Sequence, residues 1–446
     1  MAFDASQWMT PSGGGYEITN SCRFNNGHMH KTPSSDGNLD KFTFSTWVKL
    51  TEVRGGTMPL FAAGTNPSQW SRITFISSNK LNFTLYDGSN FLAAYKSEAV
   101  FKDFSAWYHI VVAVDTGQGT NTNRVKLYAN GELLTVAGGG DLIHPDQNLD
   151  THFNDATYKN WLGSEPSGDG AFSGYMAETN FVDGLQLAPS SFGETGDYGE
   201  WKPIQYEGAY GTNGFYLDYK ASGNLGNDAN GGTDLTEVTI AATDQMLDTP
   251  TNNFCTMNPL SPNTSGLTFS EGNLKMAGAD TGFFGTMGVS SGKWYYEMHS
   301  TNAAGNNLNT SAVGIVHEDA LHDTVDSSSN DGFQLFGGVN KARGYYGYAG
   351  NKLDEDSNDS YGAAFVTGDV IGVALNLDDR EITFYKNNAS QGVAFTSLGS
   401  GEWFPLWQNW TSSVGVMNFG QDSSFAGVKT AQGNQDGNDI GDFYYA

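Results

Sequence analysis

The chain has 446 residues, of which 49 are acidic and 22 are Lys or Arg, so its formal net charge is −27. A field of that sign repels phosphate groups and anionic lipids, which excludes nucleic acid as an expected partner and argues against insertion into a membrane. Glycine is abundant at 57 residues, yet 13% of the residues are aromatic, so the chain has ample material for buried cores. A prior of about 150 residues for each domain predicts two or three domains.

The N-terminal residues carry no pattern that directs export. Residues 1–10 lack a basic cluster followed by an apolar run. Elsewhere no apolar run approaches the ~20 residues that crossing a bilayer requires. The two cysteines, Cys22 and Cys255, are too few for a disulfide framework, so we expect two reduced and buried thiols.

Alternation of apolar and polar residues predicts strands throughout the first half. Residues 42–50 (FTFSTWVKL) and 80–86 (KLNFTLY) have the period of two that half-buried strands show. Residues 107–115 are a candidate central strand. Residues 124–128 are another strand, which ends at Asn130-Gly131, a dipeptide favoured in tight hairpins because both residues tolerate positive φ. No long segment has helical periodicity, so the sequence predicts an all-β fold.

The pattern changes near the middle of the chain. Residues 221–265 are rich in Gly, Asn, Asp, Thr and Pro, which is typical of a junction between domains. Strands resume after this segment, so we predict two consecutive antiparallel β-sandwiches. The predicted division is an N-terminal arm (1–20), a first domain (21–220), a junction (221–265), a second domain (266–425) and a C-terminal tail (426–446) that frays or packs late.

Four segments of the first half occur together as a set: FSTWV (44–48), WYHIVV (107–112), VKLYANG (125–131) and FSGYMAE (172–178). With them, residues 21–220 resemble the laminin-G-like branch of the concanavalin A-like lectin superfamily. In that family the W-x-H strand, the LYxNG hairpin and the strand with a Gly-x-hydrophobic-x-Glu pattern belong to one jelly-roll sandwich. The resemblance therefore implies a lectin-like first domain.

The second half carries a different set of segments: SGKWYYE (291–297), GDVIGV (368–373), LDDREITFYKN (377–387) and MNFG (417–420). In this order they resemble the signature of the SPRY domain, which is another bent β-sandwich. The resemblance implies a second binding domain of that type.

The combination of the two domains, with PSSFGE (189–194) and YGTNGFYL (210–217) between them, resembles virion proteins of marine, often cyanobacterial, bacteriophages. This resemblance implies a non-enzymatic structural protein on the virion surface, such as a tail fibre that binds a receptor or a head decoration. It would be made in the host cytoplasm and be present as a homo-oligomer or in multiple copies on each particle. Its partners would be other virion proteins and host-surface carbohydrate.

Two alternatives stay open: a purely structural capsid or tail subunit without a ligand, and a glycan-degrading enzyme on the lectin-like fold. The sequence lacks the Glu-x-Asp-x-(x)-Glu pattern that places two carboxylates of a glycosidase on one strand. Residues 194–200 (ETGDYGE) contain these letters, but at the wrong spacing and between loop glycines. Residues 288–292 (GVSSG) match a nucleophile elbow, yet a strand follows where that motif needs a helix. We therefore expect no catalytic residues.

Calcium is the cofactor that the fold suggests, because lectin-like sandwiches often hold Ca²⁺ through loop carboxylates and carbonyls. Asp115, Asp141 and Asp169 are candidate ligands. The acidic run 354–359 (DEDSND) is more typical of a solvated loop.

Aromatic rings in loops are the stronger binding candidates, because flat rings stack on the apolar face of a sugar while neighbouring amides bind its hydroxyls. We expect ligand-binding residues in three clusters: Trp70 with Asn66; Tyr345, Tyr346 and Tyr348; and Trp407, Asn409 and Trp410. The alternative for each ring is a place in the core or in a subunit interface.

Overall fold

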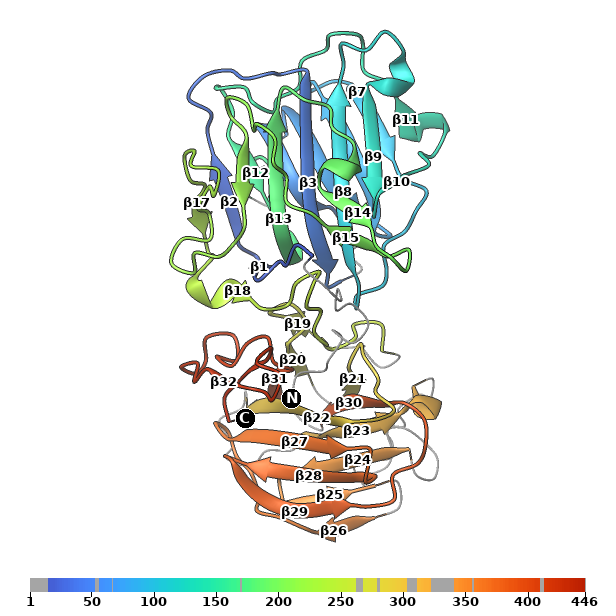
Figure 1. The fold of residues 1–446 in the computed structure, drawn as a ribbon, viewed down its shortest axis with the longest axis vertical. Helices are drawn as coiled ribbons and strands as arrows, with labels where there is room; N and C mark the ends of the chain where they lie inside the picture. Colours follow the sequence, from blue (N-terminus) through green and yellow to red (C-terminus); the bar gives the residue numbers. More distant parts are fainter. Residues whose placement is uncertain are drawn as a thin grey trace. The chain divides into compact units, whose positions relative to one another are not determined.

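The computed structural model describes residues 15–52, 56–65, 67–168, 171–261, 268–278, 281–302, 311–321, 341–354, 357–409 and 413–445. The chain divides into two compact units, an N-terminal unit that ends at Asn253 and a C-terminal unit that begins at Phe254. Both consist of antiparallel sheets, so the prediction of two consecutive all-β sandwiches is confirmed (Figure 1). In the part of the chain that the structure describes, no helical segment has the length and apolarity needed to cross a membrane.

The N-terminal unit packs two sheets around one core. One, termed the β3 sheet, has the order β10 (Glu132–Leu133), β9 (Val125–Ala129), β8 (Trp107–Asp115), β3 (Lys41–Leu50), β13 (Ser173–Asp183), β1 (Ser21–Asn25) and β18 (Gln245–Met246), and β16 (Phe215–Leu217) pairs with β13. The other, termed the β5 sheet, has the order β11 (Leu142–Ile143), β7 (Phe91–Lys96), β6 (Lys80–Tyr86), β5 (Gln69–Ile76), β4 (Met58–Thr65), β12 (Asn160–Leu162), β2 (His28–Lys31) and β17 (Thr236–Val238).

Phenylalanines that point inward from the two sheets form the centre of this core. The rings of Phe44 and Phe61 are stacked with centroids 5.1 Å apart, and Phe61 stacks in turn on Phe153 at 4.9 Å. Burying each such side chain contributes about 1.5–3 kcal/mol. The outward positions of the β3 sheet are buried as well, because Phe192 and Tyr216 pack over Val111.

The C-terminal unit has the same two-layer plan. Its β22 sheet has the order β19 (Thr268–Ser270), β20 (Lys275–Gly278), β31 (Ser413–Asn418), β22 (Lys293–Asn302), β27 (Val370–Asn376), β28 (Glu381–Lys386) and β29 (Ala389–Phe395). Its β23 sheet has the order β21 (Thr281–Phe284), β30 (Trp403–Asn409), β23 (Ser311–His317), β24 (Ala342–Tyr346), β25 (Asn351–Leu353) and β26 (Asn358–Ser360). One core cluster between them contains Tyr296, Phe384 and Trp407.

Most of the segment predicted as a junction, residues 221–265, instead belongs to the N-terminal unit. In this segment β17 pairs with β2, and β18 pairs with β1. The boundary between the units falls at Asn253, inside the predicted junction. These strands are only two or three residues long, so the alternation of residue types could not reveal them.

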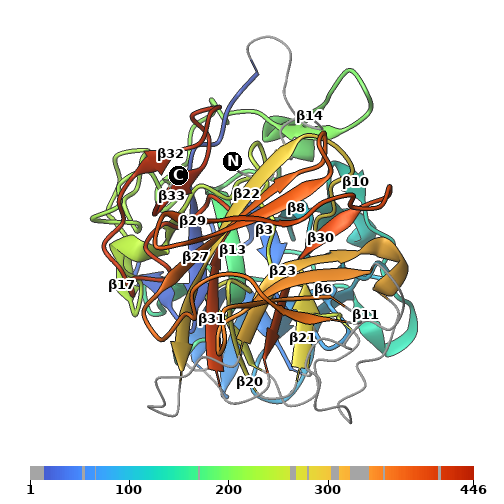
Figure 2. The same ribbon diagram turned by 90° about the horizontal axis from the view of Figure 1, so that it is seen from below.

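The C-terminal tail, which we predicted to fray or to pack late, packs against the β22 sheet. Its short strands β32 (Asn434–Gln435) and β33 (Asp442–Phe443) pair with each other (Figure 2). Phe443 is fully buried and packs edge-on against Tyr295, with ring centroids 5.2 Å apart. Tyr444 and Tyr445 also pack against the buried cluster of Val370, Val416 and Phe425, so a few aromatic residues fix the position of this polar tail, together with the backbone hydrogen bonds described below.

Candidate functional site

Cross-strand register places three rows of side chains on the outer face of the β22 sheet. The rows across β22, β27 and β28 are Lys293–Asn376–Glu381, Tyr295–Ala374–Thr383 and Glu297–Gly372–Tyr385. They share one face because successive side chains alternate across a strand. In two of the three rows the residue from the central strand β27 is small, Ala374 in one and Gly372 in the other. The middle of this face is therefore recessed relative to its sides.

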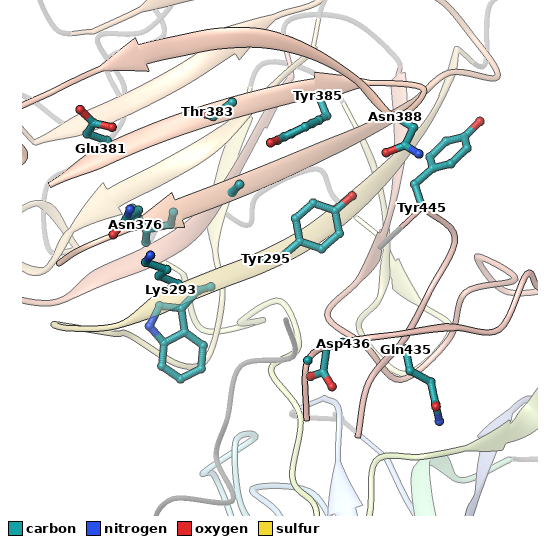
Figure 3. Close-up of a pocket in the computed structure, with 14 residues that line it drawn as sticks. Lys293, Tyr295, Asn376, Glu381, Thr383, Tyr385, Asn388, Gln435, Asp436 and Tyr445 are labelled. Carbon is teal, nitrogen blue, oxygen red and sulfur yellow. The ribbon is translucent and has the colours of Figure 1, made fainter. Parts of the chain in front are cut away.

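The C-terminal tail adds a further wall and turns this face into a pocket of about 510 Å³. Figure 3 shows Lys293, Asn376 and Glu381 at one end, and Tyr385, Asn388 and Tyr445 at the other. The lining residues are Lys293, Trp294, Tyr295, Ala374, Leu375, Asn376, Glu381, Thr383, Tyr385, Asn388, Gln435, Asp436, Gly437 and Tyr445.

The buried carboxylate of Glu297 holds the tail in place. The backbone N–H groups of Tyr444 and Tyr445 donate to its two oxygens, each at 2.8 Å. The amide of Asn418 donates to it at 3.2 Å, and the hydroxyl of Tyr295 at 3.1 Å. Burial raises the pKa of Glu297, and the donated hydrogen bonds oppose that rise. The carboxyl group of Glu297 therefore helps to fix the wall that Tyr445 forms, together with the packing of Phe443 on Tyr295.

Gly372 provides the space in which the phenol ring of Tyr295 lies. A Cβ atom at residue 372 would overlap the phenol oxygen and approach the ring carbon Cε2 to 2.8 Å. Any larger side chain there would push Tyr295 out of its place between the sheet and Glu297.

The chemistry of the pocket suits an uncharged polar ligand. Trp294, Tyr295, Tyr385 and Tyr445 supply flat rings, while Asn376, Asn388, Gln435 and Thr383 supply amide and hydroxyl groups. The carboxylate of Asp436 accepts hydrogen bonds from the backbone of Asn438 and Ile440, so it is already engaged in a turn. The charged side chains that line the pocket are Lys293, Glu381 and Asp436.

The structure corrects part of the predicted ligand-binding set. Tyr345, Trp407 and Asn409 are fully buried in the C-terminal unit, so they cannot face a ligand. They sit in strands β24 and β30 at positions that point inward, and Trp407 stacks on Phe283 with centroids 5.9 Å apart. The amide of Asn409 donates to the backbone oxygen of Ser413.

The other predicted residues of the C-terminal unit do not line the pocket. Tyr346 is half-buried and Tyr348 is 49% exposed, with their ring centroids 6.2 Å apart. Both belong to the β23 side of the unit rather than to the face of the β22 sheet. Trp410 lies outside the described residues.

In the N-terminal unit, Trp70 is half-buried on β5 rather than free in a loop. The guanidinium group of Arg72 lies 3.8 Å from its ring centroid, and Tyr86 stacks with it at 5.3 Å. Asn66, its predicted companion, lies outside the described residues.

The predicted calcium ligands do not come together. Asp115 forms an ion pair with Lys41 at 3.1 Å, and Asp141 forms one with Lys96 at 2.7 Å. Within the described ranges, no three His, Cys, Asp or Glu side chains converge in a way that would hold a metal ion. Asp169 lies outside those ranges. Asp115 and Asp141 therefore do not fit as a shared calcium site, and binding of Ca²⁺ stays a prediction that a change of melting temperature with EDTA would support.

A serine and a histidine in the N-terminal unit lie in contact, but the proton is on the wrong nitrogen for catalysis. Trp201 donates its indole N–H to Nδ1 of His109 at 3.0 Å, so the proton of the neutral ring resides on Nε2. Nε2 lies 2.9 Å from Oγ of Ser45 and donates to it. Burial lowers the pKa of His109 to about 3. His109 therefore cannot accept the proton of Ser45 as a general base does.

Glu178 on β13 is a buried carboxyl group with tyrosine neighbours. The hydroxyl of Tyr216 lies 2.9 and 2.8 Å from its two oxygens, and the hydroxyl of Tyr16 lies 2.9 Å from that of Tyr216. Burial raises the pKa of Glu178 to about 7, and the hydrogen bond from Tyr216 limits the rise. The folded chain therefore binds a proton at Glu178 more tightly than the unfolded chain does.

The raised pKa of Glu178 predicts that the stability of the folded chain falls as pH rises. The contribution of the protonated carboxyl is fully present below the unfolded pKa near 4.5 and is lost as pH approaches the folded value of about 7. The decrease in the free energy of unfolding amounts to at most about 3 kcal/mol, at ~1.4 kcal/mol for each pKa unit. In Glu178→Gln the free energy of unfolding is expected to depend less on pH, because the amide does not titrate. Urea unfolding of both proteins at pH 5 and pH 8 measures it. An equal pH dependence in the two proteins would contradict this role of Glu178.

Sequence reasoning missed the rings of the pocket. Trp294, Tyr295 and Tyr385 lie in segments used to identify the SPRY-like half, and the alternation there indicated that one face of each strand is exposed. The missing information was the docking of the tail, which brings Tyr445 to the same face.

Comparison with protein-family models identifies two domains in the chain. Residues 24–186 match the concanavalin A-like lectin/glucanases superfamily, and residues 293–422 match the SPRY domain. Both predicted domain resemblances are thus confirmed. The second range includes β22, β27 and β28, which carry the pocket.

Individual proteins match shorter parts of the chain. Ran-binding protein 9 of Xenopus tropicalis is 34% identical over 111 residues, which is 22% of this chain and 20% of that protein, so the chain spans about a fifth of the relative's length. The SPRY domain of human HERC1 is 21% identical, with a TM-score of 0.28 over 34% of this chain and 91% of that one. The heptameric SAP-like pentraxin of Limulus polyphemus is 14% identical, with a TM-score of 0.29 over 39% and 80%. The chain therefore carries a concanavalin A-like domain followed by a SPRY domain, two folds that suggest binding of carbohydrate or protein.

Proposed function

We propose that this is a binding protein whose SPRY domain accepts an uncharged glycan in the pocket on the β22 sheet. The observation that supports it is the pocket lining, in which four aromatic rings stand beside amide and hydroxyl groups. A sugar ring can stack on such rings while its hydroxyl groups bind the amides. Neighbouring protein surfaces are the alternative ligand, because a SPRY fold suggests either kind of partner.

Replacing Tyr385 with alanine tests this proposal. The change removes one ring of the pocket wall while Thr383 and Glu381 stay on the same strand. We expect affinity for glycans identified on an array to fall at least about tenfold, which corresponds to ~1.4 kcal/mol. Tyr198→Ala is the control, because Tyr198 is 92% exposed and lies in the N-terminal unit. Binding that survives in Tyr385→Ala would place the ligand elsewhere, and a clean negative array would favour the purely structural alternative.

The proposal includes no catalytic step. The Ser45–His109 contact supports this, because the ring nitrogen next to the hydroxyl already carries a proton. The experiment is incubation of the protein with polysaccharides that it binds, followed by an assay for new reducing ends. Their release at a rate proportional to protein concentration would refute the proposal and revive the enzyme alternative.

We also propose that the protein is a surface component of a bacteriophage particle, as a head decoration or a compact tail component in multiple copies. The support is the resemblance of its domain combination to phage virion proteins. On a particle, the pocket would contact host-surface glycan or a neighbouring virion protein. Immunogold labelling of intact particles tests the proposal and locates the chain on the head or the tail. Purified particles without this chain in their mass spectrum would refute it.

A further inference from the structure

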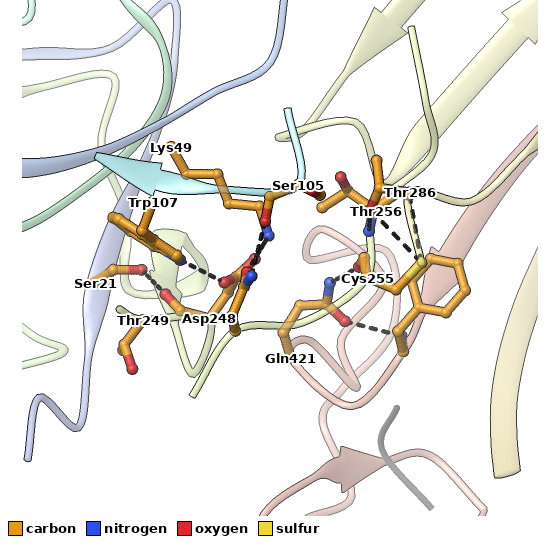
Figure 4. A network of polar contacts seen from close by, with 12 residues as sticks. Ser21, Lys49, Ser105, Trp107, Asp248, Thr249, Cys255, Thr256, Thr286 and Gln421 are labelled. Carbon is orange, nitrogen blue, oxygen red and sulfur yellow. Dashed lines mark hydrogen bonds and ion pairs between the residues drawn. The ribbon is translucent and has the colours of Figure 1, made fainter. Parts of the chain in front are cut away.

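Three side chains that meet near the end of strand β3 hold chemistry that the proposed binding function does not use. Lys49 and Asp248 are both 0% exposed, and Nζ of Lys49 lies 2.7 Å from Oδ2 of Asp248 (Figure 4). Nζ also lies 2.8 Å from Oδ1 of Asn253. An amine therefore lies within hydrogen-bonding distance of both a carboxyl group and a carboxamide.

A tight turn over residues 249–252 places two members of this set. Thr249 and Asn252 pair through both of their backbone N–H groups, at 3.0 and 3.1 Å, and Oγ1 of Thr249 also accepts the N–H of Asn252 at 3.1 Å. Asp248 and Asn253 flank the turn, so their side chains reach the same amine. Ser21 on β1 donates to the backbone oxygen of Asp248 at 2.6 Å, which ties the turn to the β3 sheet.

Further hydrogen bonds orient the carboxamide and the carboxyl group. Nδ2 of Asn253 donates to the backbone oxygen of Ser105 at 2.7 Å, which leaves Oδ1 directed at Lys49. The indole N–H of Trp107 donates to Oδ1 of Asp248 at 2.9 Å, which leaves Oδ2 for the amine. Because a carbonyl bond is about 1.2 Å long, Nζ at 2.8 Å from Oδ1 is at most about 4 Å from Cγ of Asn253. This separation is close to the ~3–3.5 Å at which held groups react.

Apolar side chains surround the amine. Trp107 on β8 and Tyr175 on β13 lie opposite Lys49 in the strand register, and both rings are buried. Ile18 and Met246 belong to the same buried cluster as these rings. A charged pair in such a site is neutralised when the ammonium group passes a proton to the carboxylate. The neutral amine that results has the lone pair that a nucleophile needs.

We infer that Lys49 and Asn253 join in an intramolecular isopeptide bond, with Asp248 as the catalytic residue that carries the protons. A bond forms between Nζ and Cγ as the bond from Cγ to Nδ2 breaks, and Nδ2 leaves as ammonia. Asp248 accepts a proton from the ammonium group, passes it to Nδ2, and then accepts the second proton that Nζ loses. The products are a secondary amide, ammonia and a protonated Asp248, so atoms and charge balance without an oxidant or a cofactor.

The bond would fasten the end of the N-terminal unit to its β3 sheet. Asn253 is the residue at which that unit ends, and Lys49 is next to the last residue of β3. The two residues are 204 positions apart in sequence, so the bond closes a long loop of the chain. Closing such a loop stabilises the fold because it removes conformations from the unfolded chain. This role is independent of any ligand of the SPRY domain.

Intact-mass spectrometry of the denatured protein tests the inference. Wild type is expected to be lighter than its sequence by the mass of one ammonia molecule, and a tryptic digest should contain a branched peptide that joins Lys49 to Asn253. Lys49→Arg and Asn253→Ala are each expected to have the full mass of their sequences. Asp248→Asn is expected to form the bond at least about 10²-fold more slowly, because an amide in place of the carboxyl group cannot carry the protons.

Asn253→Ala also separates the bond from the ion pair. This variant keeps Lys49 and Asp248 and loses only a half-buried carboxamide. Its Tm, followed by circular dichroism, is expected to be about 10 °C below that of wild type, because the long loop is no longer closed. The same variant is the reference in which the contribution of the ion pair alone can be measured.

Lys41→Arg is the matched control, because Lys41 lies on the same strand and forms an ion pair with Asp115 but is 38% exposed. It should lose ammonia as wild type does. The inference is wrong if wild type has the full mass of its sequence, or if Lys49→Arg still loses ammonia, which would place the loss at another site. Loss of water instead of ammonia would also overturn it, since a bond between Lys49 and Asp248 releases water.

Discussion

Lys49→Met is expected to lower the free energy of unfolding of the N-terminal unit by about 3–5 kcal/mol. The side chains of Lys49 and Asp248 are both 0% exposed, and their charged atoms lie 2.7 Å apart (Figure 4). Asp248 also accepts the indole N–H of Trp107 at 2.9 Å, and Lys49 donates to Asn253 at 2.8 Å. Removing the ammonium group leaves a carboxylate that is buried without its counter-charge, which is the costly way to break such a pair.

Urea unfolding followed by tryptophan fluorescence measures the loss. Two variants separate the buried pair from a general effect of removing a lysine. Lys41→Met breaks an ion pair whose lysine is 38% exposed, and it should cost less than about 1 kcal/mol. The double variant Lys49→Met/Asp248→Asn should recover much of the loss, because no charge remains buried. A Lys49→Met protein as stable as wild type would show that this pair is open to solvent.

Lys49 also shows a limit of what the sequence pattern can predict. The alternation in residues 42–50 correctly predicts a strand with Phe42, Phe44 and Val48 in the core. It also implies that Ser45 and Lys49 face solvent, whereas both are buried. The cover comes from segments without alternation: Asp248 contacts Lys49, and residues 187–217 contribute a cluster of aromatic side chains over Val111 and Val182. A local pattern cannot show that a distant, irregular segment will cover the second face of a strand.

The same limit applies to the candidate sites. The resemblance to a SPRY domain correctly placed strands over 293–298 and 381–385, which carry six of the fourteen residues that line the pocket. The predicted ligand residues were chosen as aromatic clusters, and clusters such as Trp407 with Asn409 lie in strands whose inward faces build the core. Rings that do line the pocket, such as Tyr295 and Tyr385, are separated in sequence and meet only through cross-strand register. Register is set by pairing across the sheet, which a single sequence does not display.

Trp407→Ala is expected to cost the C-terminal unit about 3–5 kcal/mol, since it removes a fully buried indole and leaves a cavity. The ring stacks on Phe283, and a Cβ atom at residue 415 would approach its Nε1 to 2.7 Å, so Gly415 is fitted to it. Nε1 has no hydrogen-bond partner among the described residues, so Trp407→Phe should cost clearly less than Trp407→Ala.

The two variants also decide between the core position and the surface position that the sequence suggested for Trp407. Thermal and urea unfolding give the stability, and the glycan affinity of Trp407→Phe should equal that of wild type because the ring does not line the pocket. A surface ligand-binding ring would give the opposite pattern, with wild-type stability for Trp407→Ala and lost affinity for both variants. The loss of stability in Trp407→Ala thus measures how much the core between the two sheets stabilises the unit that carries the pocket on its β22 sheet.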